Sequence, residues 1–591
     1  MKYAKKPKSS LSFIVFYLKK HFPLVILVFL GSVSLSLAMI KSGLIYDFGM
    51  GFWGPNGHDG IWHIALINQL AKFSLANPVF AGGKLTNYHF GFDLLAALAS
   101  RLTGLNPVKL YFQILPPSMA VLIGLLVYRF VREWTGSKKS AWWVTFFVYF
   151  AGSWGWLVSL IKTGRLGGES MFWANQAVST LINPPYALSL IILLLGLIKF
   201  LDYFEKPDKS NLIICLLLFG ILVQIKVYAG IIVLSSLFCL AVFTSILPSI
   251  EVNTQKREIW RLFILTLVVS LVIFIPFNLK SPSLLVFSPL WFPRSMLAYA
   301  DRFGLFKLEN ARIAYLNSGK WLKWILTEGL AVTIFILGNL GTRVIGFFYG
   351  GWWWRMKRKV SEMEVFLFSA LIVSLIIPLL FIQKGNPWNT IQFFYYFQFL
   401  LAIFAGVVVS NLLGMKPKQS RLHIYIYVTV GLLVGLTLPT TIATLKNDYL
   451  PSRPPARVSI EELEALSFLR HRPEGVVLTF PYDPLWKTKF SEPKPLYAYE
   501  TSAYVSALSG KQTFLEDEMN LEISGYSWQP RKEEETKFFS TSDSRWAKDF
   551  LRSSRIKYIY LVKGQKMGLD LGDIDAEKIL ENGEVTIFEV K

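Results

Sequence analysis

The sequence predicts an all-α polytopic membrane protein that carries a small α/β domain at its C-terminus. Three observations support this prediction. First, 53% of the 591 residues are hydrophobic and only 17% are charged, which is too apolar for a soluble enzyme. Second, the chain contains about eleven apolar runs of roughly 17 to 25 residues, the length that a helix needs to cross a bilayer. Third, this pattern stops near residue 445, where mixed helical and strand patterns begin.

The eleven runs are expected to form transmembrane helices. They lie near residues 22–46, 108–131, 141–161, 183–201, 211–227, 229–248, 261–279, 324–349, 365–383, 391–413 and 422–444. Basic residues precede the first run and no small-residue cleavage site follows it, so we interpret this run as an uncleaved anchor.

The distribution of Lys and Arg predicts the orientation, because basic residues accumulate in short cytoplasmic loops. With the N-terminus inside, the cytoplasmic connections are all basic: "VREWTGSKK", "DYFEKPDKS", "TQKREIWR", "WWWRMKRK" and "GMKPKQSR". We therefore expect a multi-pass plasma membrane protein with a cytoplasmic N-terminus. The predicted outer segments are 47–107, 162–182, 280–323, 384–390 and the domain 446–591, which follows the membrane domain 1–445.

The net charge of +22 does not indicate nucleic-acid binding. The first 445 residues carry 40 basic and 15 acidic residues, whereas the remainder carries 21 and 24. The positive charge thus belongs to the membrane part, where topology explains it. Cys215 and Cys239 both fall in apolar runs, so the sequence implies neither a disulfide framework nor a thiolate metal site.

The region after residue 445 predicts a compact α/β domain. Ser459 followed by Glu462 is a capping-box pattern that starts a helix. Strands are expected at 475–482, 556–564 and 583–590, and helices at 496–510 and 543–555. The domain contains no nucleotide-binding glycine pattern, no nucleophile elbow and no HExxH motif.

The first outer segment, residues 47–107, has the most informative sequence. Long ordered loops are usually functional, and this one contains two amphipathic patterns too short to span the membrane. Its stretch "GHDGIWH", residues 57–63, contains Asp59 between His58 and His63, and His89 lies further along. If a helix begins here, Asp59 and His63 are four residues apart and share a face.

This arrangement resembles the GT-C class of polyprenyl-phosphate-dependent glycosyltransferases, such as protein O-mannosyltransferases, lipid A aminoarabinose transferases and oligosaccharyltransferases. "DGIWHIALI" is similar to a D-x-x-x-H stretch of some oligosaccharyltransferases. "GGKLTNYHFGFDLLAALASRLTGLNP" resembles the second half of the loop in the other two branches. There a Lys-Pro-Pro precedes the interfacial helix, whereas here Lys84 lies further upstream and Tyr88-His89 replaces the prolines. The resemblance covers about the first 250 residues.

The resemblance implies a transferase that moves a hexose or pentose from a polyprenyl-phosphate donor to a lipid, glycan or protein acceptor. Asp59 would be the general base toward the acceptor hydroxyl, or would hold a divalent metal together with His63. His58, His63 and His89 would support Asp59. The phosphate needs cations, and Lys226, at the apex of a tight hairpin between two apolar runs, is the leading candidate. The expected substrate-binding residues are Lys84, Tyr88, His89, Arg165, Lys226, Lys384 and Gln392.

Each of these residues also has a structural interpretation. Asp59 can serve only as a helix N-cap, and the histidines can be interfacial groups with backbone partners. Lys226 and Lys384 can extend to lipid headgroups, and the tryptophans can form an interfacial belt. Arg165 and Glu169 lie in a glycine-rich loop that needs no further role.

The sequence is also compatible with two other functions. An exporter or flippase of lipid-linked glycans needs cations for phosphate but no carboxylate base, and charged or broken spans with pseudo-repeated halves are typical of transporters. A surface scaffold that binds through residues 446–591 predicts that this part alone retains activity.

Overall fold

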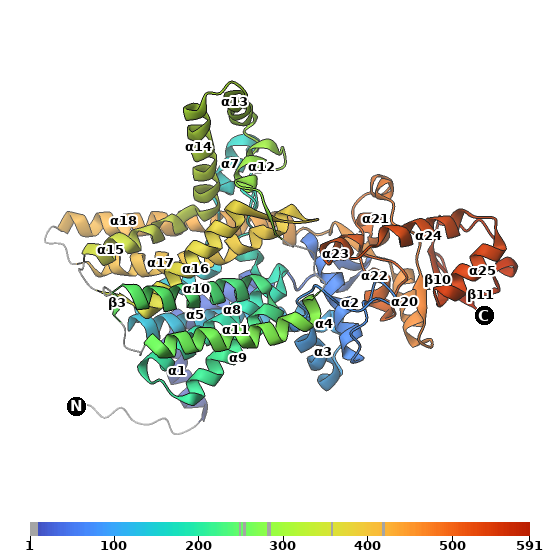
Figure 1. Ribbon diagram of the computed structural model, residues 1–591, viewed down its shortest axis with the longest axis horizontal. Coiled ribbons are helices and arrows are strands. Elements are labelled where there is room, and N and C mark those ends of the chain that lie inside the picture. Colours follow the sequence, from blue (N-terminus) through green and yellow to red (C-terminus); the bar gives the residue numbers. More distant parts are fainter. Residues whose placement is uncertain (1–9, 248–249, 252–255, 280–284, 356–358, 416–419) are drawn as a thin grey trace.

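The computed structural model describes residues 10–247, 250–251, 256–279, 285–355, 359–415 and 420–591. It consists of a long helical bundle that carries an α/β unit at one end, which we call the capped end (Figure 1). The nine N-terminal residues and parts of three basic connections, at 252–255, 356–358 and 416–419, lie outside the described residues, as do residues 280–284 of a predicted outer segment.

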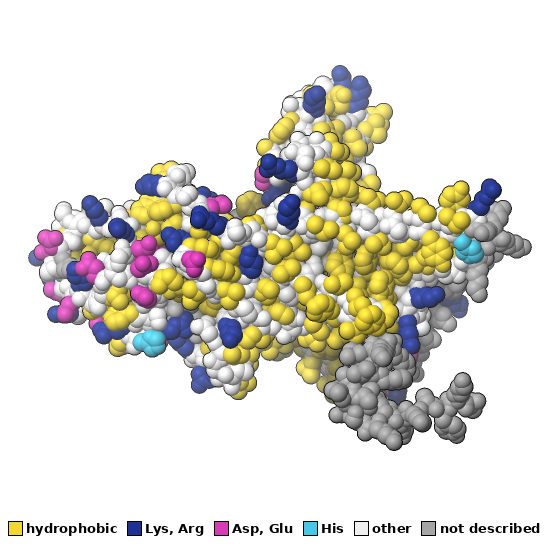
Figure 2. Space-filling view, turned by 180° about the vertical axis from the view of Figure 1, so that it is seen from behind, with side chains coloured by type: hydrophobic (Ala, Val, Ile, Leu, Met, Phe, Trp, Pro, Cys, Tyr) yellow, Lys and Arg dark blue, Asp and Glu magenta, His cyan; other side chains and the backbone are white. Residues whose placement is uncertain are grey.

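The bundle is built from long apolar helices that pack side by side. Its members are α1 (Ser10–Ser36), α5 (Leu115–Thr135), α6 (Lys138–Phe150), α8 (Pro184–Glu205), α9 (Lys209–Ile225), α10 (Val227–Ile246), α11 (Lys256–Asn278), α16 (Glu362–Leu380), α17 (Gln392–Gly414) and α18 (Ser420–Thr437). From behind, the bundle surface is almost entirely hydrophobic, whereas charged side chains gather over the capped end (Figure 2). The chain is therefore a multi-pass membrane protein.

The described residues contain eight helices long and apolar enough to span a membrane, or nine if the bent pair α6 and α7 (Gly155–Thr163) counts as one span. These nine coincide with nine of the eleven predicted runs. The other two runs form the shorter apolar helices Phe22–Ser36 and Lys209–Ile225. The count of eleven spans stays a prediction, because length and composition select nine spans among the described residues and α1 and α9 account for the other two runs.

An arm projects sideways from the bundle (Figure 1). It contains α12 (Trp291–Ala298), α13 (Phe306–Asn317) and α14 (Trp321–Leu340). Buried ion pairs hold it together: Arg312 Nη2 lies 2.7 Å from Glu309 Oε1, and Arg312 Nη1 and Arg294 Nη2 lie 3.0 and 2.9 Å from Glu328 Oε1. Short elements lead back into the bundle, namely η4 (Gly341–Phe347), α15 (Phe348–Arg355), β5 (Val360–Ser361), β6 (Phe381–Gln383) and η5 (Pro387–Ile391).

Residues 47–107, which we call the first loop, lie at the capped end and contain two short helices as predicted. The loop region comprises β1 (Ile45–Tyr46), β2 (Gly49–Phe52), η1 (Gly54–Gly57), α2 (Asp59–Ala71), α3 (Gly91–Thr103), α4 (Pro107–Lys109) and η2 (Leu110–Ile114). Helix α2 ends before Asn77 because the chain turns at Phe73, whose φ is +56°. Gly104, with a φ of +70°, ends α3.

The C-terminal unit, residues 456–591, has a four-stranded sheet of order β11-β12-β10-β8. β10 runs parallel to β8 and antiparallel to β12, with Ile559 opposite both Leu478 and Phe588. Its elements are β7 (Ala456–Val458), α20 (Ile460–His471), β8 (Val476–Leu478), η7 (Pro484–Thr488), β9 (Lys494–Pro495), α21 (Leu496–Tyr499), α22 (Tyr504–Ser509), α23 (Glu518–Ile523), α24 (Gln529–Ser540), α25 (Ser544–Ser553), β10 (Ile556–Val562), η8 (Leu571–Ile574), β11 (Ala576–Glu581) and β12 (Val585–Val590).

Most of the elements predicted for this unit are present. The Ser459–Glu462 capping box forms with both of its hydrogen bonds. The helix predicted for 496–510 is instead two short helices, α21 and α22, the second ended by Gly510 at a φ of +71°. Strand β11 and helices α23 and α24 were not predicted.

The C-terminal unit and the first loop share a second sheet, of order β1-β2-β7-β9. Met50 of β2 lies opposite Val458 of β7, and Ala456 pairs with Lys494 of β9. The first loop is thus joined to the C-terminal unit by backbone pairing as well as by side chains.

The remaining elements are η3 (Ala177–Ile182), β3 (Ile250–Glu251), β4 (Leu285–Phe287), α19 (Pro439–Thr444) and η6 (Leu445–Tyr449).

Close contact between α6 and α17 depends on Gly406. A Cβ atom at this position would lie 2.4 Å from the backbone N and Cα of Val144, so the Gly406→Ala variant must push the two helices apart. We expect it to lower the free energy of unfolding by about 1–3 kcal/mol. The measurement is thermal unfolding of the detergent-solubilised protein. Gly431→Ala in α18 is the matched control, because no atom lies within 4 Å of its Cβ; equal melting temperatures of the two variants would contradict this packing.

Candidate functional site

Two cavities adjoin at the capped end, between the bundle, the first loop and the C-terminal unit. The large cavity has a volume of about 860 Å³ and the small cavity about 500 Å³. Residues that line both cavities are Asp59, Asn175, Ile182, Asn183, Arg302, Trp388, Gln392 and Tyr395. Asp59 therefore lies at the junction of the two cavities, and we take this junction as the candidate site.

Asp59 is the first residue of α2, and its side chain is 52% exposed to the cavity space. The N-cap is His58, so Asp59 does not serve as the cap, which removes the simplest structural role for its carboxylate. His58 Nδ1 lies 2.8 Å from Asp59 Oδ1. Burial raises the pKa of Asp59, but the hydrogen bond and charge of His58, with the charges of His63 and Lys226, hold it below its ordinary value. The carboxylate is therefore ionised near neutral pH.

His58 itself lies between two carboxylates. Its Nε2 atom is 3.4 Å from Oδ1 of Asp517, a residue of the C-terminal unit that is 1% exposed. Burial lowers the pKa of His58, yet Asp517 and Asp59 together hold it well above its ordinary value. His58 is thus an imidazolium that neutralises part of the negative charge around Asp59.

His63 does not join Asp59 as predicted. Its Nδ1 atom lies 2.7 Å from Oδ1 of Asp93 on α3, and its ring stacks on Tyr111. Among the described residues, no group of three or more His, Cys, Asp or Glu side chains is arranged to hold a metal ion. The predicted metal pair of Asp59 and His63 therefore does not fit this structure, and its physical reason is the competing contact of His63 with Asp93.

Lys226 lies at the hairpin apex between α9 and α10, lines the small cavity and is only 4% exposed. Its Nζ atom is 3.3 Å from Oδ1 of Asn183, and in the described part of the chain it forms no ion pair with a carboxylate. Burial lowers the pKa of Lys226 to about 7, opposed by the charges of Asp59 and Asp93. A buried cation without a paired anion at a cavity wall fits an anionic ligand.

Arg302 is a second cation at the junction, and it lines both cavities. Its guanidinium lies over the Trp173 ring, 4.3 Å from the ring centroid, and donates to the Ser170 carbonyl at 3.3 Å. Arg302 and Lys226 thus bring two cations to the small cavity, and Oδ2 of the exposed Asp301 lies 3.6 Å from Arg302 Nε. Apolar side chains complete this cavity, including those of Ile231, Phe274 and Ile523.

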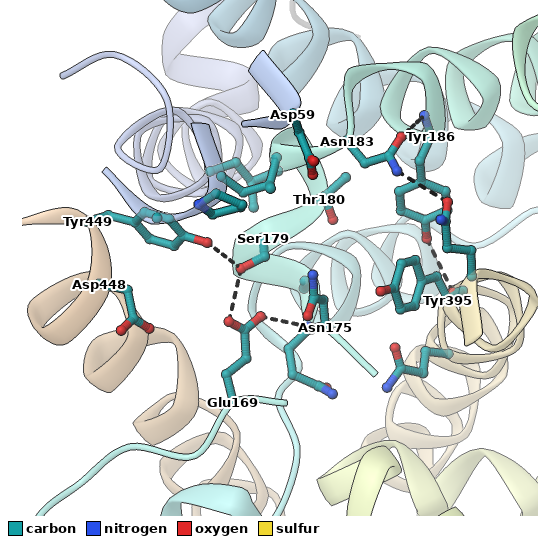
Figure 3. Close-up of a pocket in the computed structure, with 18 of the residues that line it drawn as sticks. Asp59, Glu169, Asn175, Ser179, Thr180, Asn183, Tyr186, Tyr395, Asp448 and Tyr449 are labelled. Carbon is teal, nitrogen blue, oxygen red and sulfur yellow. Dashed lines mark hydrogen bonds between the residues drawn. The ribbon is translucent and has the colours of Figure 1, made fainter. Parts of the chain in front are cut away.

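The large cavity has a polar wall of carboxylates, amides and hydroxyls (Figure 3). Glu169 Oε1 accepts the Gln176 N–H at 2.7 Å, and its Oε2 accepts the Ser179 hydroxyl at 3.0 Å. The Ser179 and Tyr449 hydroxyls are 3.0 Å apart. Burial raises the pKa of Glu169 to about 7, against these two hydrogen bonds. Glu169 is therefore part of a hydrogen-bond network with Gln176, Ser179 and Tyr449 on the wall of the large cavity.

The predicted substrate-binding residues fall into two groups. Tyr88, His89, Lys226 and Gln392 line the small cavity, together with Asp59, His58 and His63. Lys84, Arg165 and Lys384 are exposed and line neither cavity, so the structure does not bring them to the site. The carbonyl of Lys84 instead accepts a hydrogen bond from the Tyr526 hydroxyl. Charge and a predicted outer location alone selected these three residues, and neither property reports which way a side chain points.

Several residues at the site were not predicted to act there. Asn183 contacts both Lys226 and Gln392, the second through its Nδ2 atom at 3.2 Å from Gln392 Oε1. Asp517 could not be predicted from the sequence, because its contact with His58 joins residues that are far apart in the chain. Arg302 belongs to the predicted outer segment 280–323, as does Arg294, which the arm uses in its ion pairs.

No protein-family model and no curated protein sequence matches this chain. Similar folds are found among solved structures. The oligosaccharyltransferase of Archaeoglobus fulgidus, tethered to an acceptor peptide, matches 92% of this chain and 70% of its own with a TM-score of 0.51 and 13% identity. The same archaeal protein in complex with an inhibitory peptide and a dolichol-phosphate gives 0.50 and 14% over the same shares, and its complex with Zn and sulfate gives 0.51 and 14% over 91% and 68%.

ArnT from Cupriavidus metallidurans bound to undecaprenyl phosphate matches 98% of both chains with a TM-score of 0.43 and 11% identity. At such identities the likeness concerns the fold. The archaeal oligosaccharyltransferase belongs to one of the groups that the sequence resembles, so the fold expected from that resemblance is confirmed. The chain shares the fold of the archaeal oligosaccharyltransferase.

Proposed function

We propose that this protein is a membrane glycosyltransferase that transfers a sugar from a polyprenyl-phosphate donor to a hydroxyl group of a lipid, glycan or protein acceptor. One observation carries the proposal. An ionised carboxylate, Asp59, lies at the junction of the two cavities, and a buried lysine that forms no ion pair among the described residues, Lys226, lines the small cavity. The first group suits the removal of a proton and the second suits a phosphate.

The small cavity is the proposed donor site. Lys226 and Arg302 supply positive charge for the phosphate, while Ile231, Phe274 and Ile523 supply apolar surface for the first isoprene units. Tyr88, His89 and Gln392 lie on the same walls and are available to the sugar. The archaeal oligosaccharyltransferase of similar fold has been solved with dolichol-phosphate, which supports a lipid phosphate as the ligand class.

The large cavity is the proposed acceptor site. Its amide, hydroxyl and carboxylate groups can hydrogen-bond to hydroxyl-bearing substrates, and Asp59 lies on its wall as well as on that of the small cavity. Figure 3 shows Asp59, Thr180 and Asn183 close together on one wall, across from Glu169. An acceptor that enters here places its hydroxyl between Asp59 and the donor sugar.

The proposed reaction is a single displacement with inversion. The acceptor oxygen attacks the anomeric carbon as its proton passes to the Asp59 carboxylate. The bond between the anomeric carbon and the phosphate oxygen breaks, and its electron pair leaves with the polyprenyl phosphate. Lys226 and Arg302 stabilise the charge that develops on that phosphate.

The orientation of the site also belongs to the proposal. The described parts of the predicted basic connections lie at the end of the bundle away from the C-terminal unit (Figure 1), so the positive-inside rule favours a capped end outside the cytoplasm. We therefore place residues 446–591 and both cavities on the outer face.

An exporter of lipid-linked glycans would need Lys226 but would not need an ionised carboxylate at the junction.

Asp59→Asn is expected to lower kcat for sugar transfer by about 10²- to 10⁴-fold, because Asn cannot accept the acceptor proton. The measurement is transfer by purified protein from a panel of polyprenyl-phosphate sugars to hydroxyl acceptors. Asp47→Asn is the control, since Asp47 is an exposed acid in the same loop that lines neither cavity. Full turnover by Asp59→Asn would end the base assignment, and unchanged glycan export by this variant would favour the exporter.

Lys226→Gln is expected to raise KM for the donor roughly 10- to 100-fold, because a hydrogen bond to a charged group is lost. Since the free Lys226 has a pKa of about 7, the wild-type KM should also rise as the pH increases above 7 and the ammonium loses its proton. Lys226→Arg should bind donor with a KM that does not rise over this range. The same pH dependence in wild type and Lys226→Arg would show that another group binds the phosphate.

A further inference from the structure

The C-terminal unit reaches into the candidate site through one side chain, that of Asp517. Its Oδ1 atom lies 3.4 Å from Nε2 of His58, whose Nδ1 lies 2.8 Å from Asp59 Oδ1. His58 is 5% exposed and Asp517 is 1% exposed, so water does not compete for the contact between these two side chains. The three side chains form a continuous chain of contacts that ends at the proposed base.

The backbone around Asp517 is fixed against the first loop. The N–H of Glu516, the preceding residue, donates to the Val79 carbonyl at 3.0 Å, and the Thr513 N–H donates to the Pro78 carbonyl at 2.9 Å. On the other side of Asp517, Asn87 Nδ2 donates to the Ser524 carbonyl at 2.9 Å. These bonds set the distance between the C-terminal unit and His58.

The other interactions of Asp517 are those of a helix cap. Its Oδ1 accepts the Asn520 N–H at 3.1 Å and its Oδ2 accepts Asn520 Nδ2 at 2.8 Å, at the start of α23. Its φ of +51° is left-handed, a conformation that Asp and Asn adopt more readily than other side chains. An Asn at this position therefore keeps the backbone and the cap on the Asn520 N–H, while it removes the charge and the hydrogen bond from Asn520 Nδ2.

We propose that Asp517 is a positioning residue of the transfer reaction, so that the C-terminal unit is part of the active site. Asp517 holds the His58 imidazolium, and His58 in turn fixes the Asp59 carboxylate at the cavity junction. The inference depends on the proposed function only for the reaction that is measured, because the contact between Asp517 and His58 is independent of the substrate.

The charged surroundings of this chain are limited to a few groups. Asp517 and Asp59 face His58. The charges of His63 and Lys226 also lower the pKa of Asp59. His63 is held by Asp93 on α3 and Lys226 by Asn183. Loss of the Asp517 charge therefore leaves Asp59 as the sole carboxylate contact of His58 among the described residues.

The test compares Asp517→Asn with Asp543→Asn in the full-length protein. Asp543 is a matched control, because it caps α25 through the Trp546 N–H at 3.0 Å but lines neither cavity. We expect Asp517→Asn to lower kcat by about 10- to 100-fold with little change in KM or melting temperature, because a small displacement of a catalytic group is costly. Asp543→Asn should keep the wild-type kcat, and Asp517→Glu should recover part of it.

A second readout does not require turnover. Exchange of the His58 C2 hydrogen with deuterium, followed by mass spectrometry against pH, reports how readily this imidazole is protonated, and chymotryptic cleavage after Trp62 separates His58 from His63. The titration midpoint of His58 should fall in Asp517→Asn and stay unchanged in Asp543→Asn. Equal midpoints and equal kcat values in all three proteins would overturn the inference. A wild type without transfer, but with the midpoint shift, would refute the proposed function and leave the contact established.

Discussion

The charges of Asp59 and Lys226 are held at the junction where the first loop, the α9–α10 hairpin and the C-terminal unit meet. A charge removed from water is costly unless other groups replace the solvent. Asp59 has this replacement in His58, whereas Lys226 has the amide oxygen of Asn183 and the ring of Tyr228, and among the described residues it forms no ion pair with a carboxylate. The site thus contains a satisfied anion beside a cation that still lacks one, and an anionic substrate corrects the imbalance.

The C-terminal unit contacts this junction through a shared sheet and through hydrogen bonds to the first loop. The shared sheet β1-β2-β7-β9 and the hydrogen bonds from residues 513–526 to the first loop fix α2, and with it Asp59, relative to the bundle. Helix α23 also closes the small cavity through Met519, Asn520 and Ile523. A surface scaffold that acts independently of the membrane part has no need of such contacts. This architecture makes the bundle, the first loop and the C-terminal unit a single functional body.

Much of the fold was predictable, because apolar length and basic connections are local properties of the sequence. Nine of eleven runs correspond to spanning helices, and the short helices of the first loop and the capping box at Ser459 followed from local patterns. Asp59, His58 and Lys226 were found because their position is unusual in an apolar chain. Asp517 and the pairing of His63 with Asp93 depend on how distant segments dock, which no local pattern encodes. Lys84, Arg165 and Lys384 line neither cavity, because lysines and arginines of outer segments also occur on exposed surface.

The most direct measurement of the central claim is an experimental structure of the protein with a polyprenyl phosphate bound. The account predicts the phosphate in the small cavity, within hydrogen-bonding distance of Lys226 Nζ, with the Asp59 carboxylate facing the open space beside it. A phosphate bound at another surface, or an Asp59 side chain directed away from both cavities in that complex, would contradict the account.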